Sequence, residues 1–422
     1  MTAPTAVLKT FVMSSGERYC LLVDPESGVP LFYPNLFVTT QVRNAGLSVS
    51  SMQTALVAIN VLYSYCTAQR LDIETRLESG EYLAEHELDG LRDFCQRSFK
   101  RSSEPNKNNV FSIRSGIRVG RAHGVSVVKP AVAYTRLSLI ADYLSWLSKI
   151  LVRGALNKDR SAMVERMCSG LRGRRPLTRG RSTLNAEISL TKDQLSDLQD
   201  LVRPDSPRNP FHDGGVRSRN NLIIQLLIGL GVRGGELLNI RVSDIDWTLS
   251  HVVVARRPDD KNDPRVDQPL VKTQDRRIPI NGALLATLRD YVVNVRKKIP
   301  GAKRHEYLLV VHKPGPTLGA PLSKQGYFKM IDRVADSSEL NGRLHGHLLR
   351  HTWNHNFSEY LDSLEDPPTE AVQEKMRSYI QGWKEGSGTA SVYNARFIRK
   401  KAAEASLSLQ NQMMRLPKGV NK

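Results

Sequence analysis

Apolar residues recur at helical spacing through much of the amino-terminal half of the chain. Leu56, Ile59, Leu62 and Tyr63 follow the serines at 48 and 50, and the segments 84–99, 129–152 and 158–170 have the same period. This spacing predicts helices that share one core. Before residue 46 the pattern is different, because short apolar runs at 19–23 and 31–33 are separated by a Pro- and Gly-containing turn. That earlier stretch is predicted to be β-rich.

The carboxyl-terminal half mixes two periods. Thr191 to Gln194 has the composition of a capping box, which predicts a helix start, and helical spacing continues at 217–230, 282–298, 323–337, 348–361, 369–381 and from 389. Alternating apolar residues predict a strand at 251–255 and a pair of strands at 270–272 and 277–280. The fold class is therefore predicted to be mainly α with a small antiparallel β-sheet.

The segment 172–190 separates these two halves. Its first ten residues contain five arginines, together with Pro176 and two glycines, and no acidic residue; the arginines are Arg172, Arg174, Arg175, Arg179 and Arg181. Such a composition cannot form a core and is typical of a linker. We expect a β-rich segment at 1–45, a helical domain at 46–171, this linker, an α+β domain at 191–400 and a tail at 401–422.

Charge narrows the range of partners. The chain has 61 Lys and Arg against 42 Asp and Glu, a formal net charge of +19. A surface of this kind attracts polyanions, and nucleic acid is the leading candidate, although ribosomal and membrane-surface proteins share the property. The arginine-rich linker is expected to lie along a phosphate backbone, with solubility alone as the alternative explanation.

Cysteine usage and hydropathy indicate the compartment. The four cysteines are far apart and form no Cys-x-x-Cys pair, which argues against a disulfide framework or a cysteine-based zinc site. The amino terminus lacks the apolar core of a signal peptide, and the longest apolar run, 222–230, is too short to span a bilayer. We expect a cytoplasmic protein, associated with the nucleoid if bacterial, with no membrane partner.

Residues 229–247 contain the first candidates for catalytic residues. A glycine-rich break exposes Arg233, and Glu236 lies three residues later, where it can orient that arginine. Arginine suits phosphate binding because its planar fork contacts two oxygens and keeps its charge. The whole segment, which ends in Ser-Asp-Ile-Asp-Trp before a predicted strand, resembles the first signature segment of the tyrosine recombinases, the phage-type integrases.

A second segment is similar to the same family. Gly346-His347-Leu-Leu-Arg350-His351-Thr matches the family's His-x-x-Arg-His-Thr pattern. The resemblance implies that His347 transfers protons, that Arg350 is the second phosphate ligand and that His351 supports them. A metal site is the alternative, since His347, His351 and His355 are spaced to share one helical face. That face is not continuous if His347 precedes the helix, as it does in the family.

Three further residues complete the resemblance. Lys272 stands in a Lys-Thr context before an apolar-Pro-apolar strand, Gly382-Trp383 matches the tryptophan variant of the third segment, and Tyr393 follows. The interval from Trp383 to Tyr393 is about one residue longer than the common form. Tyr379 is the rival nucleophile, but its position before Gly-Trp is interpreted as a core position. The motifs cover about residues 190–400, and 46–171 resembles the family's core-binding domain by position and pattern only.

The resemblance implies a site-specific DNA recombinase or integrase. Tyr393 is expected to attack a scissile phosphate and form a 3′-phosphotyrosyl link, while Arg233 and Arg350 stabilise the phosphate charge, Lys272 and His347 handle protons and Trp383 supports the site. No cofactor or metal is needed. Expected partners are double-stranded DNA recombination sites, three further copies in a homotetramer and accessory proteins of a mobile element. Whether the tail exchanges between protomers stays open.

Three other functions remain possible from the sequence. A type IB-like topoisomerase would use the same residues and reseal the original strand, a non-enzymatic DNA-binding protein would need only the basic surface, and a metal nuclease would use the histidines. Free tyrosine has a pKa of about 10 and attacks poorly at neutral pH unless cations and a base assist it. The combination of cationic and imidazole groups with a late tyrosine therefore favours the recombinase chemistry.

Overall fold

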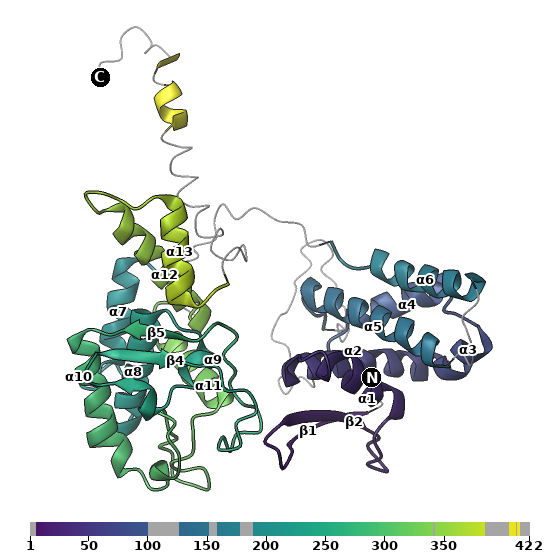
Figure 1. The fold of residues 1–422 in the computed structure, drawn as a ribbon, viewed down its shortest axis with the longest axis horizontal. Helices are drawn as coiled ribbons and strands as arrows, with labels where there is room; N and C mark the ends of the chain where they lie inside the picture. The colour runs from purple at the N-terminus through teal and green to yellow at the C-terminus, as the bar shows by residue number, and fades with distance from the viewer. Residues whose placement is uncertain are drawn as a thin grey trace, which may run out of the picture. The chain divides into compact units, whose positions relative to one another are not determined.

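The chain folds as two compact units, seen here in a computed structural model that describes residues 6–99, 126–151, 158–177, 189–340, 342–384, 405–410 and 412–413. The first unit comprises Met1–Met13 and Arg18–Thr183, and the second comprises Leu184–Lys422, to which Ser14–Glu17 are assigned. Both are mainly helical and each contains a small antiparallel sheet, so the predicted fold class is confirmed (Figure 1).

The first unit begins with a β-hairpin and continues as helices. Its elements are β1 (Val7–Val12), β2 (Arg18–Val23), α1 (Phe32–Phe37), a π-helix (Val38–Arg43), α2 (Val49–Gln69), α3 (Ile73–Ser79), α4 (Glu85–Cys95), α5 (Pro130–Leu151) and α6 (Lys158–Gly173). The predicted strand at 31–33 is wrong, because Phe32 opens α1. Pro34 stands in the first turn of α1, where the missing N–H of proline costs nothing and its fixed φ favours a helix.

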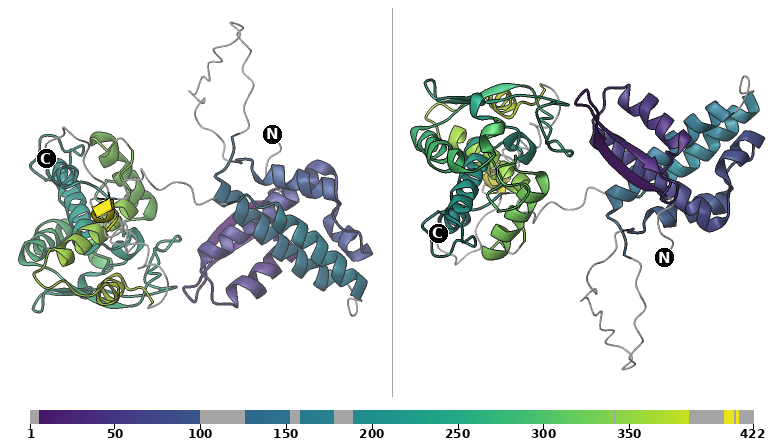
Figure 2. Two further views of the ribbon diagram at one scale, coloured as in Figure 1. Left: turned by 90° about the horizontal axis from the view of Figure 1, so that it is seen from above. Right: turned by 90° about the horizontal axis from the view of Figure 1, so that it is seen from below.

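One apolar core holds the first unit together. Helices α2 and α5 pack against each other at its centre, and β2 lies along α2 (Figures 1 and 2). Cys20 and Leu22 of β2 belong to the same buried cluster as Leu62 of α2 and Leu144 of α5. The hairpin therefore shares its core with the helices that follow it.

The second unit is an α+β structure. Its elements are α7 (Lys192–Val202), α8 (Gly214–Leu230), α9 (Gly234–Leu237), a 3-10 turn (Val242–Asp244), β3 (Ile245–Asp246), β4 (His251–Val254), β5 (Arg276–Pro279), α10 (Gly282–Asp290), a π-helix (Tyr291–Val295), 3-10 turns (Arg296–Lys298 and Ala302–Arg304), α11 (Lys324–Ser337), α12 (Gly346–Asp362) and α13 (Glu370–Gln381). Helix α8 contacts α7, α10 and α12 and is buried along most of its length. The predicted capping box at the start of α7 is confirmed, with Thr191 and Gln194 bonded reciprocally.

The small sheet of the second unit has the order β3-β4-β5, with all pairs antiparallel. Val252 and Val254 of β4 and Ile278 of β5 face the core. The predicted pairing of 270–272 with 277–280 is wrong, because β5 pairs with β4. The three consecutive valines of β4 fit a half-buried pleated surface better than the segment that follows Pro269. Residues 255–275 therefore connect the two strands without joining the sheet.

No helix in the described ranges combines the length and the apolar character needed to cross a bilayer.

Candidate active site

Glu236 lies at the centre of the predicted site, fully enclosed by cationic and polar groups. Its Oε2 accepts hydrogen bonds from Arg276 Nη2 at 2.8 Å and from the backbone N–H of Arg233 at 3.0 Å. Its Oε1 accepts from Thr273 Oγ1 at 2.8 Å and from Arg233 Nη1 at 3.2 Å. Arg350 Nη1 lies 3.8 Å from Oε2. One carboxylate thus joins three arginines that lie far apart in the sequence.

The charge of Glu236 is stabilised by these neighbours. Burial alone raises its pKa, but the guanidinium groups of Arg276 and Arg350 outweigh that effect, and the pKa is lowered overall. A buried carboxylate that stays ionised needs such partners, since an unpaired buried charge is very costly. The site therefore has one buried negative charge, on Glu236, surrounded by the positive charges of three arginines.

Local backbone geometry presents Arg233. Helix α8 ends at Leu230 and is capped by Gly231, whose φ of 61° lies in the left-handed region that glycine adopts readily. Arg233 then stands at the N-cap of α9, in an extended conformation, and its backbone N–H is bonded to Glu236 at the third helical position. The Arg233 side chain is 33% exposed. Its guanidinium is consequently oriented by Glu236 and still open to solvent on one side.

Arg350 comes from α12 and is enclosed, with 1% of its surface exposed. Its Nη1 donates to the carbonyl of Gly231 at 2.8 Å and its Nη2 to the carbonyl of Gln381 at 3.2 Å. The guanidinium also lies over the indole ring of Trp383, 5.3 Å from the ring centroid. Arg350 thereby brings together the segments of α8, α12 and α13 that contain the three predicted motifs.

Trp383 is buried, with 6% exposure, directly after the end of α13. The prediction that Tyr379 is a core residue is wrong, because its side chain is 68% exposed. On α13 the buried positions are Gln373, Arg377, Ser378 and Gln381, and Tyr379 lies on the opposite side of the helix. Tyr393 lies outside the residues that the structure describes.

The histidines of the second motif lie at the start of α12. His345 is the N-cap, and its Nδ1 accepts from the backbone N–H of Leu348 at 3.0 Å. His347 lies within α12, which begins at Gly346, so the condition under which the histidine face would be interrupted is not met. His347 and His351 touch edge to face with ring centroids 4.2 Å apart, and His355 lies 3.4 Å from Glu359. No group of three or more potential metal ligands was found among the described His, Cys, Asp and Glu residues.

Both rings of this histidine pair are held toward the neutral form. The pKa of His347 is lowered by partial burial and by the nearby charges of Arg350 and Arg233. Burial, followed by His347, lowers the pKa of His351 to about 4. A neutral imidazole can accept a proton, so His347 has the protonation state that a proton acceptor needs near neutral pH.

Lys272 is exposed and lies in the long connection between β4 and β5. Thr273, the next residue, is buried against Glu236, so Lys272 emerges at the edge of the arginine cluster. The connection between β4 and β5 places Lys272, because the predicted pairing of 270–272 with 277–280 does not form.

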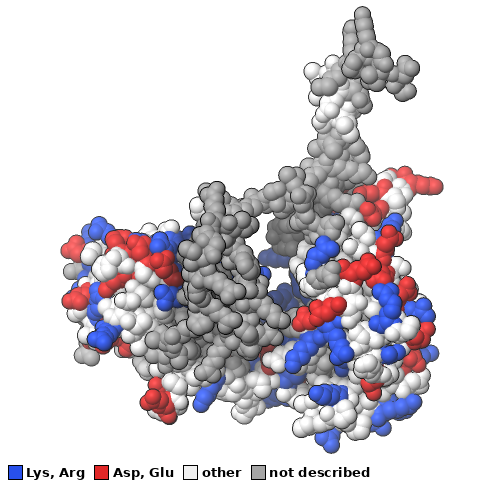
Figure 3. All heavy atoms as spheres, turned by 180° about the vertical axis from the view of Figure 1, so that it is seen from behind, with Lys and Arg blue, Asp and Glu red and all other residues white. Residues whose placement is uncertain are grey.

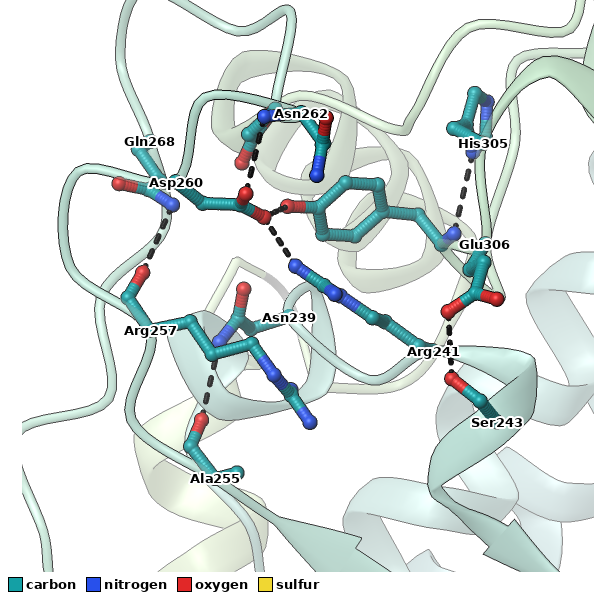
Figure 4. Close-up of polar contacts among 12 residues, drawn as sticks. Asn239, Arg241, Ser243, Ala255, Arg257, Asp260, Asn262, Gln268, His305 and Glu306 are labelled. Carbon is teal, nitrogen blue, oxygen red and sulfur yellow. Dashed lines mark hydrogen bonds and ion pairs between the residues drawn. The ribbon is translucent and has the colours of Figure 1, made fainter. Parts of the chain in front are cut away.

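A polar network holds the connection 255–275 in place (Figure 4). Asp260 pairs with Arg241 and also accepts from Tyr307 Oη at 2.8 Å. Arg257 pairs with Asp244, and the backbone carbonyl of Arg257 accepts from Gln268 Nε2 at 3.0 Å. The long excursion is therefore tied to the body of the second unit at several points before it reaches Lys272.

The predicted linker arginines begin inside the first unit. Arg172 pairs with Asp142, Arg174 pairs with Asp89 and Glu85, and Arg175 lies over the ring of Tyr134 at 4.6 Å. Arg179 and Arg181 lie outside the described residues. On the face shown in Figure 3, basic and acidic side chains are interspersed. The DNA-binding role of these arginines stays a prediction.

Two residues of the cluster were absent from the prediction. Arg276 and Thr273 both contact Glu236, and both are buried. Strand alternation contained the signal, because β5 places Arg276 inward and its neighbour Arg277 outward. An inward arginine needs buried hydrogen-bond acceptors, and the Glu236 carboxylate is one of those of Arg276.

Comparison with known proteins adds an independent line of evidence. Residues 189–397 match the profile of the phage integrase family. The tyrosine recombinase XerD of Halalkalibacterium halodurans is 26% identical over 159 residues, covering 38% of this chain and 45% of that protein. The tyrosine recombinase XerC of Staphylococcus epidermidis is 28% identical over 142 residues, covering 34% and 41%. The matched region therefore spans less than half the length of these relatives.

Solved structures of recombinases are similar at low sequence identity. The XerH site-specific recombinase bound to difH substrate aligns with a TM-score of 0.49 and 15% identity, covering 85% of this chain and 80% of that one. The Tn1549 transposon integrase in complex with a circular intermediate DNA aligns with a TM-score of 0.38 and 16% identity, covering 61% and 80%. The sequence match includes all the motif segments that meet around Glu236, and residues 189–397 form a domain of the phage integrase family.

Proposed function

We propose that this protein is a site-specific DNA recombinase that cuts and rejoins duplex DNA through a 3′-phosphotyrosyl intermediate at Tyr393. The observation that carries the proposal is the cluster around Glu236, which brings Arg233, Arg350 and the Trp383 turn into one site. Arg233 is partly exposed and Arg350 is enclosed, and the site has a net positive charge. Such a site can bind a phosphodiester and stabilise the negative charge that builds up on its oxygens during displacement.

The proposed cleavage step balances without a cofactor. The Tyr393 oxygen forms a bond to phosphorus as it loses its proton, and the bond from phosphorus to the 5′ oxygen breaks. The 5′ oxygen then takes a proton and leaves as a hydroxyl. His347 is the proposed acceptor of the tyrosine proton, and Lys272 the proposed donor to the leaving oxygen. Arg233 and Arg350 hold the non-bridging oxygens. Because the phosphotyrosyl bond retains the energy of the phosphodiester, a 5′-hydroxyl from a partner duplex can reverse the step.

The remaining parts of the proposal concern assembly. We propose that the first unit is the core-binding domain and grips the duplex, with the arginines from Arg172 to Arg181 between it and the catalytic unit. The net charge of +19 supports a DNA partner. Strand exchange between two duplexes needs four active sites, so a homotetramer on paired sites is the proposed assembly. A mobile element, with accessory proteins, is the proposed setting for integration or transposition.

A nicked duplex tests the chemistry directly. DNA fragments that bind the protein are selected from genomic DNA, and duplexes made from them carry a nick just past each candidate cleavage position, so that a short 5′-ended product diffuses away. Wild-type protein is expected to accumulate a covalent adduct on a denaturing gel, and Tyr393→Phe is expected to form none. Tyr379→Phe is the matched control, because that exposed tyrosine should leave the adduct unchanged.

Other outcomes identify other functions. An adduct that survives Tyr393→Phe would overturn the assignment of the nucleophile, and the absence of any wild-type adduct would favour a protein that only binds DNA. Relaxation of an arbitrary supercoiled plasmid without recombination would indicate a type IB-like topoisomerase. Cleavage without an adduct that stops in chelator would indicate a metal nuclease.

A further inference from the structure

The carboxyl-terminal end of α13 is fixed by groups from two other segments. Four carbonyls at the end of a helix lack helical partners. Here the carbonyls of Ser378 and Tyr379 accept from the backbone N–H groups of Trp383 at 2.9 Å and Gly382 at 3.2 Å. The carbonyl of Gln381 accepts from Arg350 Nη2. The one that remains, the carbonyl of Ile380, needs a donor from elsewhere.

Arg276 supplies that donor. Its Nε lies 2.6 Å from the carbonyl oxygen of Ile380, its Nη2 lies 2.8 Å from Glu236 Oε2 and its Nη1 lies 2.9 Å from Thr273 Oγ1. All three nitrogens of this guanidinium therefore bond groups of the site. Arg276 is 5% exposed, so these bonds are sheltered from water.

Close packing at Gly382 supports the same contact. Gly382 has a φ of 64°, and a Cβ there would lie 2.8 Å from Arg276 Nη1 and 2.8 Å from the carbonyl oxygen of Gln274. The backbone N–H of Gln274 also donates to the carbonyl of Gly382 at 3.0 Å. Glycine is needed both for the left-handed conformation and for the close approach of residues 273–276. The turn before Trp383 therefore packs closely against the segment that contains Lys272 and Arg276.

We propose that Arg276 is a positioning residue for strand cleavage, which ties Glu236 and the arginines around it to the end of α13 and so sets where the Tyr393 segment starts. The inference rests on the proposed function. Tyr393 follows Gly382 by eleven positions, so the end of α13 is where the segment that leads to the proposed nucleophile begins. A misplacement of about 1 Å at a reacting group can slow a reaction about 10²-fold.

The same contact links the nucleophile to phosphate binding. Glu236 contacts Arg233, Arg276 and Arg350. A shift of Arg233 or Arg350, the proposed phosphate ligands, therefore changes the position of Glu236 and, through it, of Arg276 at the end of α13. A lysine at 276 cannot bond Ile380, Glu236 and Thr273 together, because an ammonium lacks the planar fork. The geometry of an arginine, rather than charge alone, is therefore required.

The test compares Arg276→Met with Arg277→Met in single-turnover cleavage of the nicked duplex at saturating DNA. Arg277 is the matched control, since it is the next residue of β5 and faces outward. Arg276→Met is expected to lower the rate of adduct formation about 10²-fold, with little change in DNA affinity. Arg277→Met should stay within about threefold of wild type. Arg276→Lys should fall between wild type and Arg276→Met.

A sulfur substitution shows through which residue Arg276 acts. When the 5′ bridging oxygen is replaced by sulfur, the leaving group is a thiolate, which needs no proton because a thiol has a pKa of about 8.5. Lys272→Ala should recover on this substrate, whereas Arg276→Met should not. Recovery of Arg276→Met would overturn the proposal, because it would mean that Arg276 acts through Lys272.

Folding is controlled with a milder variant. Thr273→Val keeps the shape of the side chain and removes the hydroxyl that bonds both Glu236 and Arg276. It should reduce cleavage less than Arg276→Met and show the same lack of recovery with sulfur. If Arg276→Met is insoluble, wild-type rates in Thr273→Val and Arg276→Lys would overturn the proposal. Absence of an adduct with wild-type protein would instead refute the proposed function.

Discussion

The two units bury different kinds of side chain. The core of the first unit is aliphatic, aromatic and thiol, and it includes all four cysteines of the chain. Among the described residues the first unit buries one charged side chain, Arg18, whereas the second has a comparable apolar cluster and also buries a set of charged groups; these are Arg219, Glu236, Asp244, Asp263, Arg265, Arg276, Arg296, Arg350 and Arg377. Even a paired buried charge contributes little net stability, because desolvation offsets the attraction, and an unpaired buried charge is strongly destabilising. The first unit is thus held mainly by apolar packing, whereas the second encloses most of the buried charges of the described residues.

The two cores therefore respond differently to substitution. An apolar core loses stability in proportion to the volume removed and keeps its surface chemistry. A core organised around Glu236 loses geometry when one partner is removed, since the remaining guanidinium groups repel one another. Four predictions test this difference, beginning with the largest effect.

Glu236→Gln removes the charge at the centre of the arginine cluster. We expect the rate of adduct formation to fall about 10³-fold, the size of effect seen when an organised electrostatic group is lost from an active site. Single-turnover cleavage at saturating DNA measures it. Glu306→Gln is the matched control, because this exposed glutamate of the same unit accepts a side-chain hydrogen bond from Ser243 and lies outside the arginine cluster. Equal rates for the two variants would contradict the role of Glu236.

Leu62→Ala makes a cavity in the core of the first unit. Leu62 is fully buried on α2, and such a truncation lowers the free energy of unfolding by about 2–5 kcal/mol. Urea denaturation measures this loss, and the cleavage rate of the folded protein should stay close to wild type. Val57→Ala, at an exposed site on the same helix, is the control. A large loss of cleavage with Leu62→Ala, at conditions where the protein is folded and saturated with DNA, would contradict the expected difference between the two cores.

Acid should destabilise the second unit through His312. Burial, with the charge of Arg219, lowers the pKa of His312 to about 4, and its Nε2 lies 3.2 Å from Tyr291 Oη. Because the folded-state pKa lies below the unfolded value, the stability is fully present above about pH 6.5 and is lost as the pH falls toward 4. The loss should approach about 3 kcal/mol.

Calorimetry between pH 7 and 4 measures this dependence. His312→Asn removes the group that must take a proton, so the variant should show a weaker fall in the unfolding temperature of the second unit. The first unit has only His86 and His123 in its sequence range. An unchanged pH dependence in His312→Asn would remove His312 as the cause.

Arg174→Ala should have the smallest effect. Arg174 is partly buried, but its partners Glu85 and Asp89 are exposed at the surface of the first unit, and ion pairs open to water contribute little. The urea midpoint should shift by less than in any variant above. The slope of log affinity against log salt for DNA should fall by about one unit or less, the value for one phosphate contact. A larger change in slope would mean that several contacts depend on this arginine.

Much of the fold follows from pattern alone. The helices α2, α5, α6, α8, α11, α12 and α13 lie close to the predicted ranges because their apolar spacing and caps are local properties. The errors at 31–33 and 270–272 came from short apolar runs, which do not distinguish strands from other structures. Pro34 favoured a helix in the first case, and the valines of β4 took the sheet partner in the second.

The sequence by itself determined the family, the charge and the set of residues that suit phosphate chemistry, because these depend on residue type, order and spacing. Only the tertiary structure decided that Glu236 joins Arg233, Arg276 and Arg350, that Tyr379 faces outward and that His347 lies within α12. Arg276 is 40 positions from Glu236 and 104 from Ile380. Contacts over such separations arise when helices and strands pack, and no local pattern contains them.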